Sequence, residues 1–210
     1  EKSLFLKKLQ KQNIDNKRIK WIKNFDSIKK GPVIFFGNEF FDAISIKQFS
    51  NINNELFEKY YSVKNKINII EKFIKSDEKD MTQIKKFETL KKLKFIEFPK
   101  KGFLELNPII KKINKLSGGI LLIDYGYLNE NNSNTIQAVM DNKKISTETM
   151  LKNLGKADIT SLVNFNLLKE YFLKNKLKVK KIVTQRFFLE RMGIIERARI
   201  LEKQKTNTEK

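Results

Sequence analysis

The fold of this chain is decided by a short stretch at residues 37–49, which reads GNEFFDAISIKQF. The five residues just before it, PVIFF, form a wholly apolar run, and such a run is typical of a strand buried on both faces within a parallel sheet. The stretch then places Asn38, Glu39 and Asp42 directly after the strand. Because open α/β sheets bind their ligands beyond the carboxyl ends of their strands, we expect a functional site here.

The acidic pair in this stretch has two interpretations. In the structural one, Asn38 caps a short helix and Glu39 and Asp42 occupy its first turn, where negative charge is favourable. In the functional one, the two carboxylates bind a cationic group, since buried acidic side chains are costly unless something cationic lies against them. The residue types alone leave both interpretations open.

The composition of the 210 residues excludes several kinds of site. There is no cysteine, which excludes disulfides and thiolate metal sites, and no histidine, the commonest metal ligand and general base. We therefore expect no metal site, and any proton acceptor must be Asp, Glu, Tyr or a Lys with a lowered pKa. No apolar run approaches the roughly 20 residues that cross a bilayer, so we expect no membrane insertion.

The formal net charge of +20 invites a nucleic-acid partner. The positive charge is nearly all lysine, however, and it is spread along the whole chain rather than gathered in one stripe. This distribution favours a solvated surface over a nucleic-acid interface.

The apolar pattern predicts an α/β fold whose core is interrupted once. A second wholly apolar run, Ile120–Ile123, predicts another buried parallel strand, again followed by polar residues at Asp124 and Tyr125. We expect residues 1–50 and 102–201 to form one α/β domain. Residues 51–101 would be an antiparallel subdomain inserted into it, and residues 202–210 a disordered tail.

Other helices and strands are expected from the spacing of apolar residues and from residues that typically begin or end a helix. Ser3 caps a helix with an apolar stripe from Leu4 to Ile14, and Asn107 caps a second helix with Pro108 in its first position. Leu128–Thr135 is expected to be a mobile loop. The remaining expectations are strands at 19–25, 44–49, 56–63, 67–74 (after a tight turn at 64–66) and 177–184, and helices at 82–93, 165–174, 187–192 and 194–201.

Four stretches of the chain, in the same order, resemble the MidA-type S-adenosyl-L-methionine (SAM)-dependent methyltransferases, whose mitochondrial members assist assembly of respiratory complex I. They are residues 37–49, residues 104–108 leading to GGILLIDYG at 118–126, GKADIT at 155–160, and TQRFFLERMGI at 184–194. Together they extend over most of the chain, which makes the resemblance specific.

The resemblance implies a Rossmann-like class I methyltransferase sheet whose first strand and glycine-rich SAM loop lie upstream of this chain. It implies SAM as the cofactor, with Glu1, Gly37 and Asn38 as candidate binding residues. Trp21 either helps to wall the adenine pocket or packs in the core. With the first strand missing, we expect the chain alone to be inactive and to bind SAM weakly.

The resemblance further implies symmetric dimethylation of an arginine on a complex I subunit, in the bacterial cytoplasm or the mitochondrial matrix. A guanidinium stays protonated and presents five donors, so its site needs carboxylates. Glu39 and Asp42 are therefore the candidate catalytic residues. The candidate substrate-binding residues are Asp124, Tyr125, Gln185 and Arg186.

The chain departs from the family pattern at three positions. The histidine usual a few residues after Ala138 is absent, and Leu162 and Asn164 replace a histidine and an aspartate. Two alternatives therefore remain beside the arginine methyltransferase. One is a nucleic-acid methyltransferase or RNA-binding module, suggested by the charge, and the other is a non-catalytic assembly factor that keeps the fold.

Overall fold

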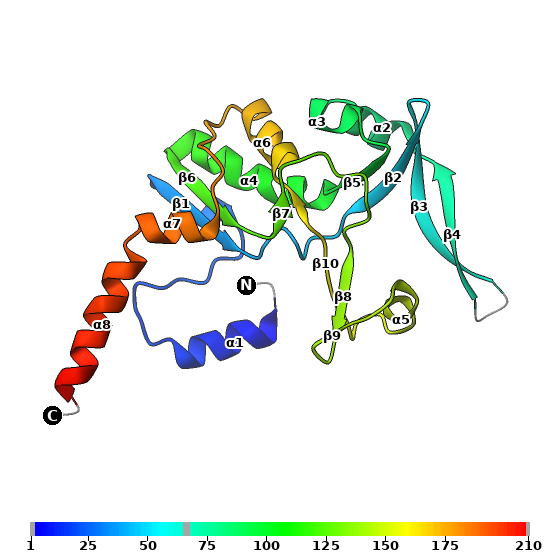
Figure 1. Ribbon diagram of the computed structural model, residues 1–210. Helices are drawn as coiled ribbons and strands as arrows, with labels where there is room; N and C mark the ends of the chain where they lie inside the picture. Colours follow the sequence, from blue (N-terminus) through cyan, green and yellow to red (C-terminus); the bar gives the residue numbers. More distant parts are fainter. Residues whose placement is uncertain (1–2, 65–67, 209–210) are drawn as a thin grey trace. The chain divides into compact units, whose positions relative to one another are not determined.

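A computed structural model describes residues 3–64 and 68–208 (Figure 1). The chain divides into two compact units, Glu1–Leu177 and Lys178–Lys210. All the described strands and helices α1–α6 belong to the first unit, and helices α7 and α8 belong to the second.

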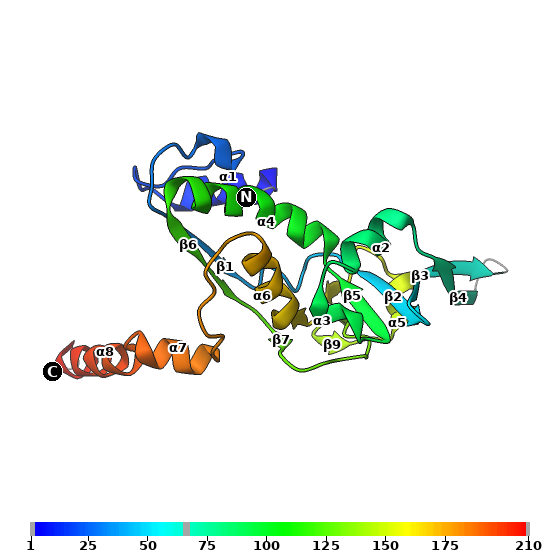
Figure 2. The same cartoon turned by 90° about the horizontal axis from the view of Figure 1, so that it is seen from above.

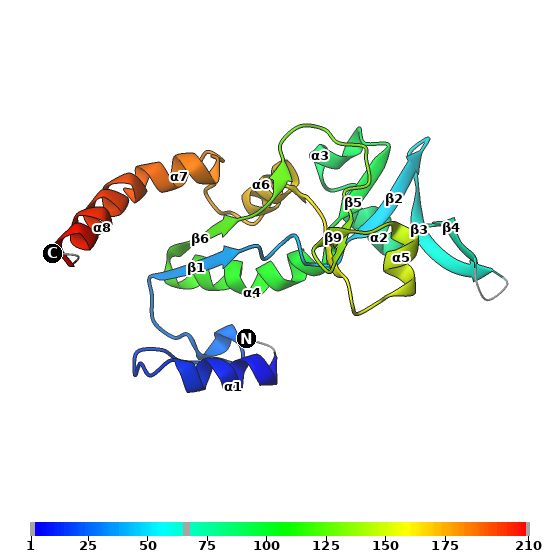
Figure 3. The ribbon, with the colours of Figure 1, turned by 60° about the horizontal axis from the view of Figure 1, so that its bottom comes forward.

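Two parallel strands carry the candidate site. β1 (Val33–Asn38) pairs with β6 (Gly118–Ile123) in a register that sets Val33 opposite Gly118 and Asn38 opposite Ile123. α4 (Lys100–Leu116) lies along this pair (Figure 3). The sequence predicts β1 buried on both faces, but Ile34 is 83% exposed and Phe36 66% exposed. The described residues thus cover only one face of β1.

A glycine makes the sharp turn from α4 into β6 possible. Ser117 ends the helix with φ of 62°, and Gly118 follows with φ of +126°, a conformation that favours glycine. A Cβ at Gly118 would also collide with the carbonyl oxygen of Val33. The residue therefore sets both the direction of β6 and its close approach to β1.

The prediction that α4 begins at Asn107 and Pro108 is wrong. The helix begins at Lys100 and contains Pro108 in its interior, which costs about 3 kcal/mol. The extra turns bury Phe103 and Leu106, at about 1.5–3 kcal/mol for each side chain, so burial offsets the proline. Asn107 instead accepts a hydrogen bond from the Tyr171 hydroxyl.

The predicted antiparallel insertion is a four-stranded sheet with the order β4–β3–β2–β5. The predicted strands at 56–63 and 67–74 correspond to β3 and β4, and Figure 2 shows this hairpin extending beyond β2 and β5. The predicted turn at 64–66 falls largely outside the described residues. The strand bounds are β2 Lys47–Ile52, β3 Glu55–Lys64, β4 Asn68–Lys75 and β5 Phe95–Phe98.

The single helix predicted at 82–93 is two short helices, α2 (Glu78–Ile84) and α3 (Glu88–Lys91). The break between them turns Phe87 into the core, where its ring centroid lies 6.0 Å from that of Phe98 and 5.4 Å from that of Phe103. Tyr171 stacks on Phe103 at 3.9 Å. This aromatic cluster joins the inserted sheet to α4 and α6 (Phe165–Lys174), the helix predicted at 165–174.

The remaining elements of the first unit are short. β7 pairs in parallel with β11, and β8 lies between β10 and β9 in a three-stranded antiparallel sheet. Ser3 caps α1 as predicted, although Leu4 and Phe5 of its apolar stripe are exposed. The bounds are α1 Leu4–Asn13, η1 Phe25–Ser27, β7 Gly126–Tyr127, β8 Gln137–Met140, β9 Lys143–Lys144, α5 Thr147–Lys152, β10 Asp158–Thr160 and β11 Val163–Asn164.

Three predicted strands differ from the structure. Residues 19–25 and 177–184 form no strand, because neither segment pairs with a neighbouring strand, and Asn24 instead caps η1. The strand predicted at 44–49 begins only at Lys47.

The loop at 128–135 was expected to be mobile, but hydrogen bonds fix it to the inserted sheet. The Asn132 side chain accepts from the backbone N–H of Lys94 at 2.6 Å. The Thr135 hydroxyl donates to the carboxylate of Glu97 at 2.5 Å. The composition of residues 128–135 could not predict these hydrogen bonds, because their partners are distant in the sequence.

The second unit consists of α7 (Gln185–Arg191) and α8 (Ile194–Thr208). Both helices were predicted, but α8 continues to Thr208, through most of the range for which the sequence predicts a disordered tail.

A buried ion cluster joins the inserted sheet to α4. Asp80 on α2 is fully buried, with its carboxylate 2.6 Å from Lys47 Nζ and 2.5 Å from Lys100 Nζ. Burial opposes the ionisation of Asp80, but the hydrogen bonds from the two lysines outweigh it and lower the pKa of the carboxyl group. The cluster thereby connects three elements that are distant in sequence.

We predict that Asp80→Asn lowers the free energy of unfolding by about 3 kcal/mol, the lower end for breaking a buried ion pair, since each lysine side chain remains 33% exposed. The lowered pKa means that this stability is present above about pH 4 and is lost as the pH falls toward the folded-state pKa. Urea unfolding at pH 7 and at pH 3 measures both effects. Glu78→Gln, exposed on the same helix, serves as the control. A cost that persists unchanged at pH 3 would contradict the ionic explanation.

Candidate functional site

The carboxyl ends of β1 and β6 lie side by side, as the sequence predicts. The backbone N–H of Glu39 donates to the carbonyl oxygen of Ile123 at 2.9 Å, which extends the ladder one residue beyond Asn38. Glu39 has φ of 48°, so the chain turns sharply at this residue. The segment that follows is not helical, so Asn38 caps no helix. The structural interpretation of the acidic pair is therefore wrong.

Asp124 fixes the turn that follows β1. One oxygen of its carboxylate accepts hydrogen bonds from the backbone N–H of Phe41 at 2.7 Å and of Asp42 at 3.3 Å. The other accepts from the N–H of Tyr125 at 2.9 Å. Asp124 thus connects the end of β6 to the segment that carries the acidic pair.

Tyr125 and Glu39 contact each other directly. The Tyr125 hydroxyl donates to Oε1 of Glu39 at 3.1 Å, while 61% of the Tyr125 side chain remains exposed. This hydrogen bond and the nearby negative charge raise the pKa of Tyr125. One carboxylate oxygen of Glu39 is therefore oriented by a neutral phenol.

Asp42 is the buried member of the cluster, with 8% of its surface exposed. Within the described part of the chain, its Oδ1 has no hydrogen-bond partner. Burial raises the pKa of Asp42, and the negative charges of Asp124, Glu39 and Asp158 raise it further, against the opposing hydrogen bond from Ala43. A ligand that brings positive charge and N–H donors would stabilise this carboxylate.

Asp158 was not predicted as a site residue. It lies in β10, and its negative charge contributes to the raised pKa of Asp42. The backbone explains the proximity, because the N–H of Ser161 donates to the carbonyl oxygen of Asp42 at 3.0 Å. The GKADIT motif at 155–160 was the only sequence signal that pointed toward this residue.

The predicted cofactor residues are dispersed. A Cβ at Gly37 would lie 3.0 Å from Leu122 Cδ2 and 3.2 Å from Phe40 Cβ, so Gly37 faces protein side chains. Asn38 is exposed on the same open face of β1 as Ile34 and Phe36. The described contacts of Trp21 are a hydrogen bond to Gln10 and the Lys11 ammonium 5.9 Å from its ring. Glu1 lies outside the described residues.

The predicted substrate residues are divided between the two units. Asp124 and Tyr125 lie beside Glu39, whereas Gln185 and Arg186 belong to α7 in the second unit. Within that unit, Arg186 Nε lies 2.9 Å from Glu190 Oε1. The site that the first unit brings together consists of Glu39, Asp42, Asp124, Tyr125 and Asp158.

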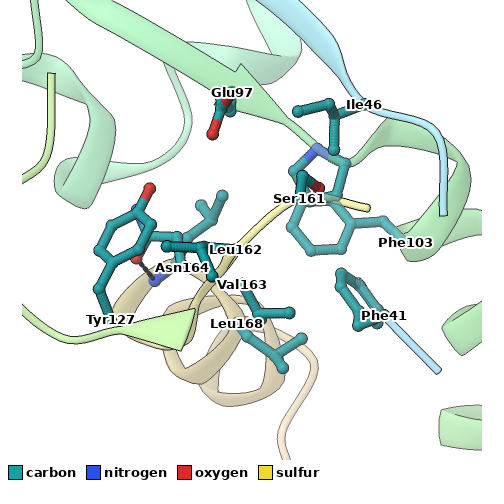
Figure 4. A pocket seen from close by; sticks show the side chains of 12 residues that line it. Phe41, Ile46, Glu97, Phe103, Tyr127, Ser161, Leu162, Val163, Asn164 and Leu168 are labelled. Carbon is teal, nitrogen blue, oxygen red and sulfur yellow. Dashed lines mark hydrogen bonds between the residues drawn. The ribbon is translucent and has the colours of Figure 1, made fainter. Parts of the chain in front are cut away.

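A small cavity lies behind Phe41 (Figure 4). Its volume is about 20 Å³, room for one water molecule, so it cannot hold a cofactor. The Tyr127 hydroxyl lies on the side of Glu97, and burial together with the charge of Glu97 raises the pKa of Tyr127 to about 12. This cavity is a packing feature.

Leu162 and Asn164, two of the positions that depart from the family pattern, line the same cavity. Asn164 also caps α6, because its side-chain oxygen accepts from the N–H of Leu167 at 3.0 Å. An aspartate would cap the helix equally well, so this substitution preserves the local structure. The structure offers no comparable explanation for Leu162.

Within residues 3–64 and 68–208, no three acidic side chains are grouped so that they could hold a metal ion. No helix of the described chain is long and apolar enough to cross a membrane.

Comparison with solved structures shows the same fold. A COG1565 superfamily protein from Burkholderia thailandensis, solved with S-adenosyl-homocysteine bound, matches with a TM-score of 0.57 at 15% identity, over 75% of this chain and 41% of that one. A native crystal structure of a COG1565 superfamily protein from the same organism matches with a TM-score of 0.59 at 15% identity, over 75% of this chain and 42% of that one. These matches support the predicted α/β methyltransferase fold with an antiparallel insertion.

Sequence comparison gives relatives named as protein arginine methyltransferases. The mitochondrial NDUFAF7 homologue of Caenorhabditis elegans is 30% identical over 190 residues, which is 87% of this chain and 42% of the worm protein. Mitochondrial NDUFAF7 of Danio rerio is 24% identical over 87% of this chain and 42% of its own length. The chain thus spans less than half the length of these curated relatives.

A family model described as "Putative S-adenosyl-L-methionine-dependent methyltransferase" matches residues 1–183. This range contains the paired strands, the inserted sheet and every carboxylate of the site. The chain belongs to this family of SAM-dependent methyltransferases.

Proposed function

We propose that the protein transfers a methyl group from SAM to an arginine side chain of a protein substrate, and that Glu39 and Asp42 receive the guanidinium. The observation that carries this proposal is the buried Oδ1 of Asp42, which lacks a partner in the described chain. Glu39 adds a second carboxylate at the end of the same strand. The names of the C. elegans and D. rerio relatives support arginine as the acceptor.

Two carboxylates that lie close enough for one to raise the pKa of the other, Glu39 and Asp42, suit a guanidinium acceptor. A guanidinium stays protonated and presents five N–H donors in a planar fork, so it can contact two carboxylates at once. Asp42 and Glu39 would draw positive charge away from the attacking nitrogen and stabilise the developing cation. The methylated nitrogen loses a proton, which the carboxylate of Glu39 or Asp42 can accept, so a histidine base is not required.

We propose that the cofactor binds at the open end of β1. SAM supplies a methyl group on a positively charged sulfonium. Asn38 is exposed at the carboxyl end of the strand, and Ile34 and Phe36 present exposed apolar surface on the same face. We propose that Asn38 donates to and accepts from polar groups of the cofactor, with Glu1 on its ribose. The main task of these residues is to orient donor and acceptor, an effect that can supply about 7–11 kcal/mol.

We propose a core subunit of respiratory complex I as the substrate protein, and the mitochondrial matrix or the bacterial cytoplasm as the compartment. The resemblance of the four sequence stretches to MidA-type enzymes supports the substrate. The names of the C. elegans and D. rerio relatives include "mitochondrial", which supports the matrix if the source is eukaryotic.

We predict that Glu39→Gln lowers methyl transfer by more than tenfold, which is about 1.4 kcal/mol of barrier, because it removes charge while keeping size. The assay uses the protein made from its complete reading frame, radiolabelled SAM, and an arginine peptide beside its lysine counterpart. Glu148→Gln, an exposed glutamate on α5, is the matched control and should remain active.

Transfer to the lysine peptide at an equal rate would contradict arginine as the acceptor. Two results would contradict the role of Glu39, namely full activity of Glu39→Gln, and loss of thermal stability by Glu39→Gln with unchanged specific activity. The last result would show that Glu39 only maintains the fold.

A second prediction concerns the hydrogen bond between Tyr125 and Glu39. Since the Glu39 carboxylate disfavours the phenolate, Glu39→Gln should lower the pKa of Tyr125 toward the ordinary value of about 10. NMR of ¹³Cζ-labelled tyrosine, with the resonance assigned by Tyr125→Phe, measures this pKa in the 210-residue chain. An unchanged pKa would mean that the two side chains are not in contact in solution.

A further inference from the structure

Residues 161–163 form a bridge segment between the two halves of the candidate site. The backbone N–H of Ser161 donates to the carbonyl oxygen of Asp42, in the turn after β1, at 3.0 Å. The backbone N–H of Val163 donates to the carbonyl oxygen of Tyr125, which follows β6, at 2.8 Å. The bridge segment therefore fixes the position of Asp42 relative to Tyr125.

The middle of the bridge segment is held by a side chain from another part of the fold. The backbone N–H of Leu162 donates to the Thr135 hydroxyl at 3.0 Å. Thr135 is buried, so a water molecule cannot easily take the place of this hydroxyl. The position of the bridge segment thus depends on where the Thr135 hydroxyl points.

Glu97 of β5 determines that direction. The Thr135 hydroxyl donates to Glu97 Oε2 at 2.5 Å, and the backbone N–H of Thr135 donates to Oε1 at 3.0 Å. Oε1 also accepts from the side chain of Gln48, at 2.8 Å. A hydroxyl has only one hydrogen to donate, so its lone pairs are left for the N–H of Leu162. Buried hydrogen-bond networks of this kind hold their members in one arrangement.

Close packing transmits the position of the bridge segment to Tyr125. Val163 lies opposite Gly126, the first residue of β7 and the neighbour of Tyr125. A Cβ at Gly126 would collide with the carbonyl oxygen of Val163, so β7 and β11 approach as closely as glycine allows. The bridge segment cannot shift at Val163 without moving Gly126.

We propose that Glu97 and Thr135 are positioning residues of the candidate site. Glu97 orients the Thr135 hydroxyl, and that hydroxyl fixes the N–H of Leu162. The bridge segment then holds Asp42 and Tyr125 in place. The inserted sheet, which contributes Glu97, thereby sets the geometry of a site to which it adds no reacting group. The effect on arginine methylation rests on the proposed function, whereas the effect on the site geometry does not.

The test compares three threonine variants. Thr135→Val keeps the shape of the side chain and removes the hydroxyl, and Thr135→Ser retains the hydroxyl. Thr89→Val is the matched control, because Thr89 donates to Glu170 through both its backbone N–H and its hydroxyl, at 2.9 and 2.7 Å. Thr135 contacts Glu97 in the same way, but Thr89 lies in α3, outside the site.

NMR of the protein made from its complete reading frame measures the geometry of the site. In Thr135→Val, the amide hydrogens of Ser161 and Val163 should exchange with solvent at least about tenfold faster than in Thr89→Val. The pKa of Tyr125 should fall toward the ordinary value of about 10, because its contact with Glu39 loosens. Thr89→Val and Thr135→Ser should leave this pKa unchanged.

Glu97→Gln tests the other member of the pair. An amide has one oxygen, so it cannot accept on both sides as the two oxygens of Glu97 do. This variant should therefore change amide exchange and the pKa of Tyr125 in the same direction as Thr135→Val. Circular dichroism checks that each variant folds.

Methyl transfer to an arginine peptide gives the functional readout. Thr135→Val should lower kcat by at least about tenfold while the affinity for SAM is unchanged, because a misplaced orienting group costs rate rather than cofactor binding. Thr89→Val and Thr135→Ser should remain active.

Three results would overturn the inference. They are equal NMR changes in Thr135→Val and Thr89→Val, failure of Thr135→Ser to restore the wild-type values, and full methyl transfer by Thr135→Val. If the wild-type protein transfers no methyl group to arginine, only the proposed function is contradicted. The NMR readouts need no substrate, so they still decide whether Glu97 and Thr135 position the site.

Discussion

The carboxylate of Asp124 holds the ends of the two parallel strands together, and the candidate site depends on it. It accepts hydrogen bonds from the backbone N–H groups of Phe41, Asp42 and Tyr125, so most of its acceptor capacity is used within the protein. Charge-assisted bonds of this kind are short and directional. Asp124 therefore positions the turn, whereas Glu39 is exposed and the buried Oδ1 of Asp42 has no partner among the described residues.

The site is acidic although the chain is strongly basic. At physiological salt, charges separated by more than about 8 Å are largely screened, so the lysines spread over the surface do not prevent a local cluster of carboxylates from binding a cation. The cluster stands on a rigid support. Phe41 lies in the turn after β1 and packs against Phe103 of α4, and the ion cluster of Asp80 secures α4 to the inserted sheet. Substrate binding can then draw on groups already in place.

The sequence was informative where structure follows local pattern and uninformative where distant residues decide it. The apolar run before Gly37 placed β1 and the acidic pair correctly, and alternation placed the hairpin of β3 and β4. The early start of α4 was missed because Pro108 is a strong local signal that burial of Phe103 and Leu106 overrides. Asp158 was missed because its approach to Asp42 depends on the fold of a segment more than a hundred residues away.

The central claim is that Glu39 and Asp42 receive a guanidinium at the end of β1. The most direct measurement is a crystal structure of the protein from its complete reading frame, with S-adenosyl-homocysteine and an arginine peptide bound. The account predicts guanidinium nitrogens within hydrogen-bond distance of Asp42 Oδ1 and of Glu39, with the nearest nitrogen facing the sulfur of the cofactor. An arginine side chain bound elsewhere, with Asp42 Oδ1 paired to a group of the protein itself, would contradict it.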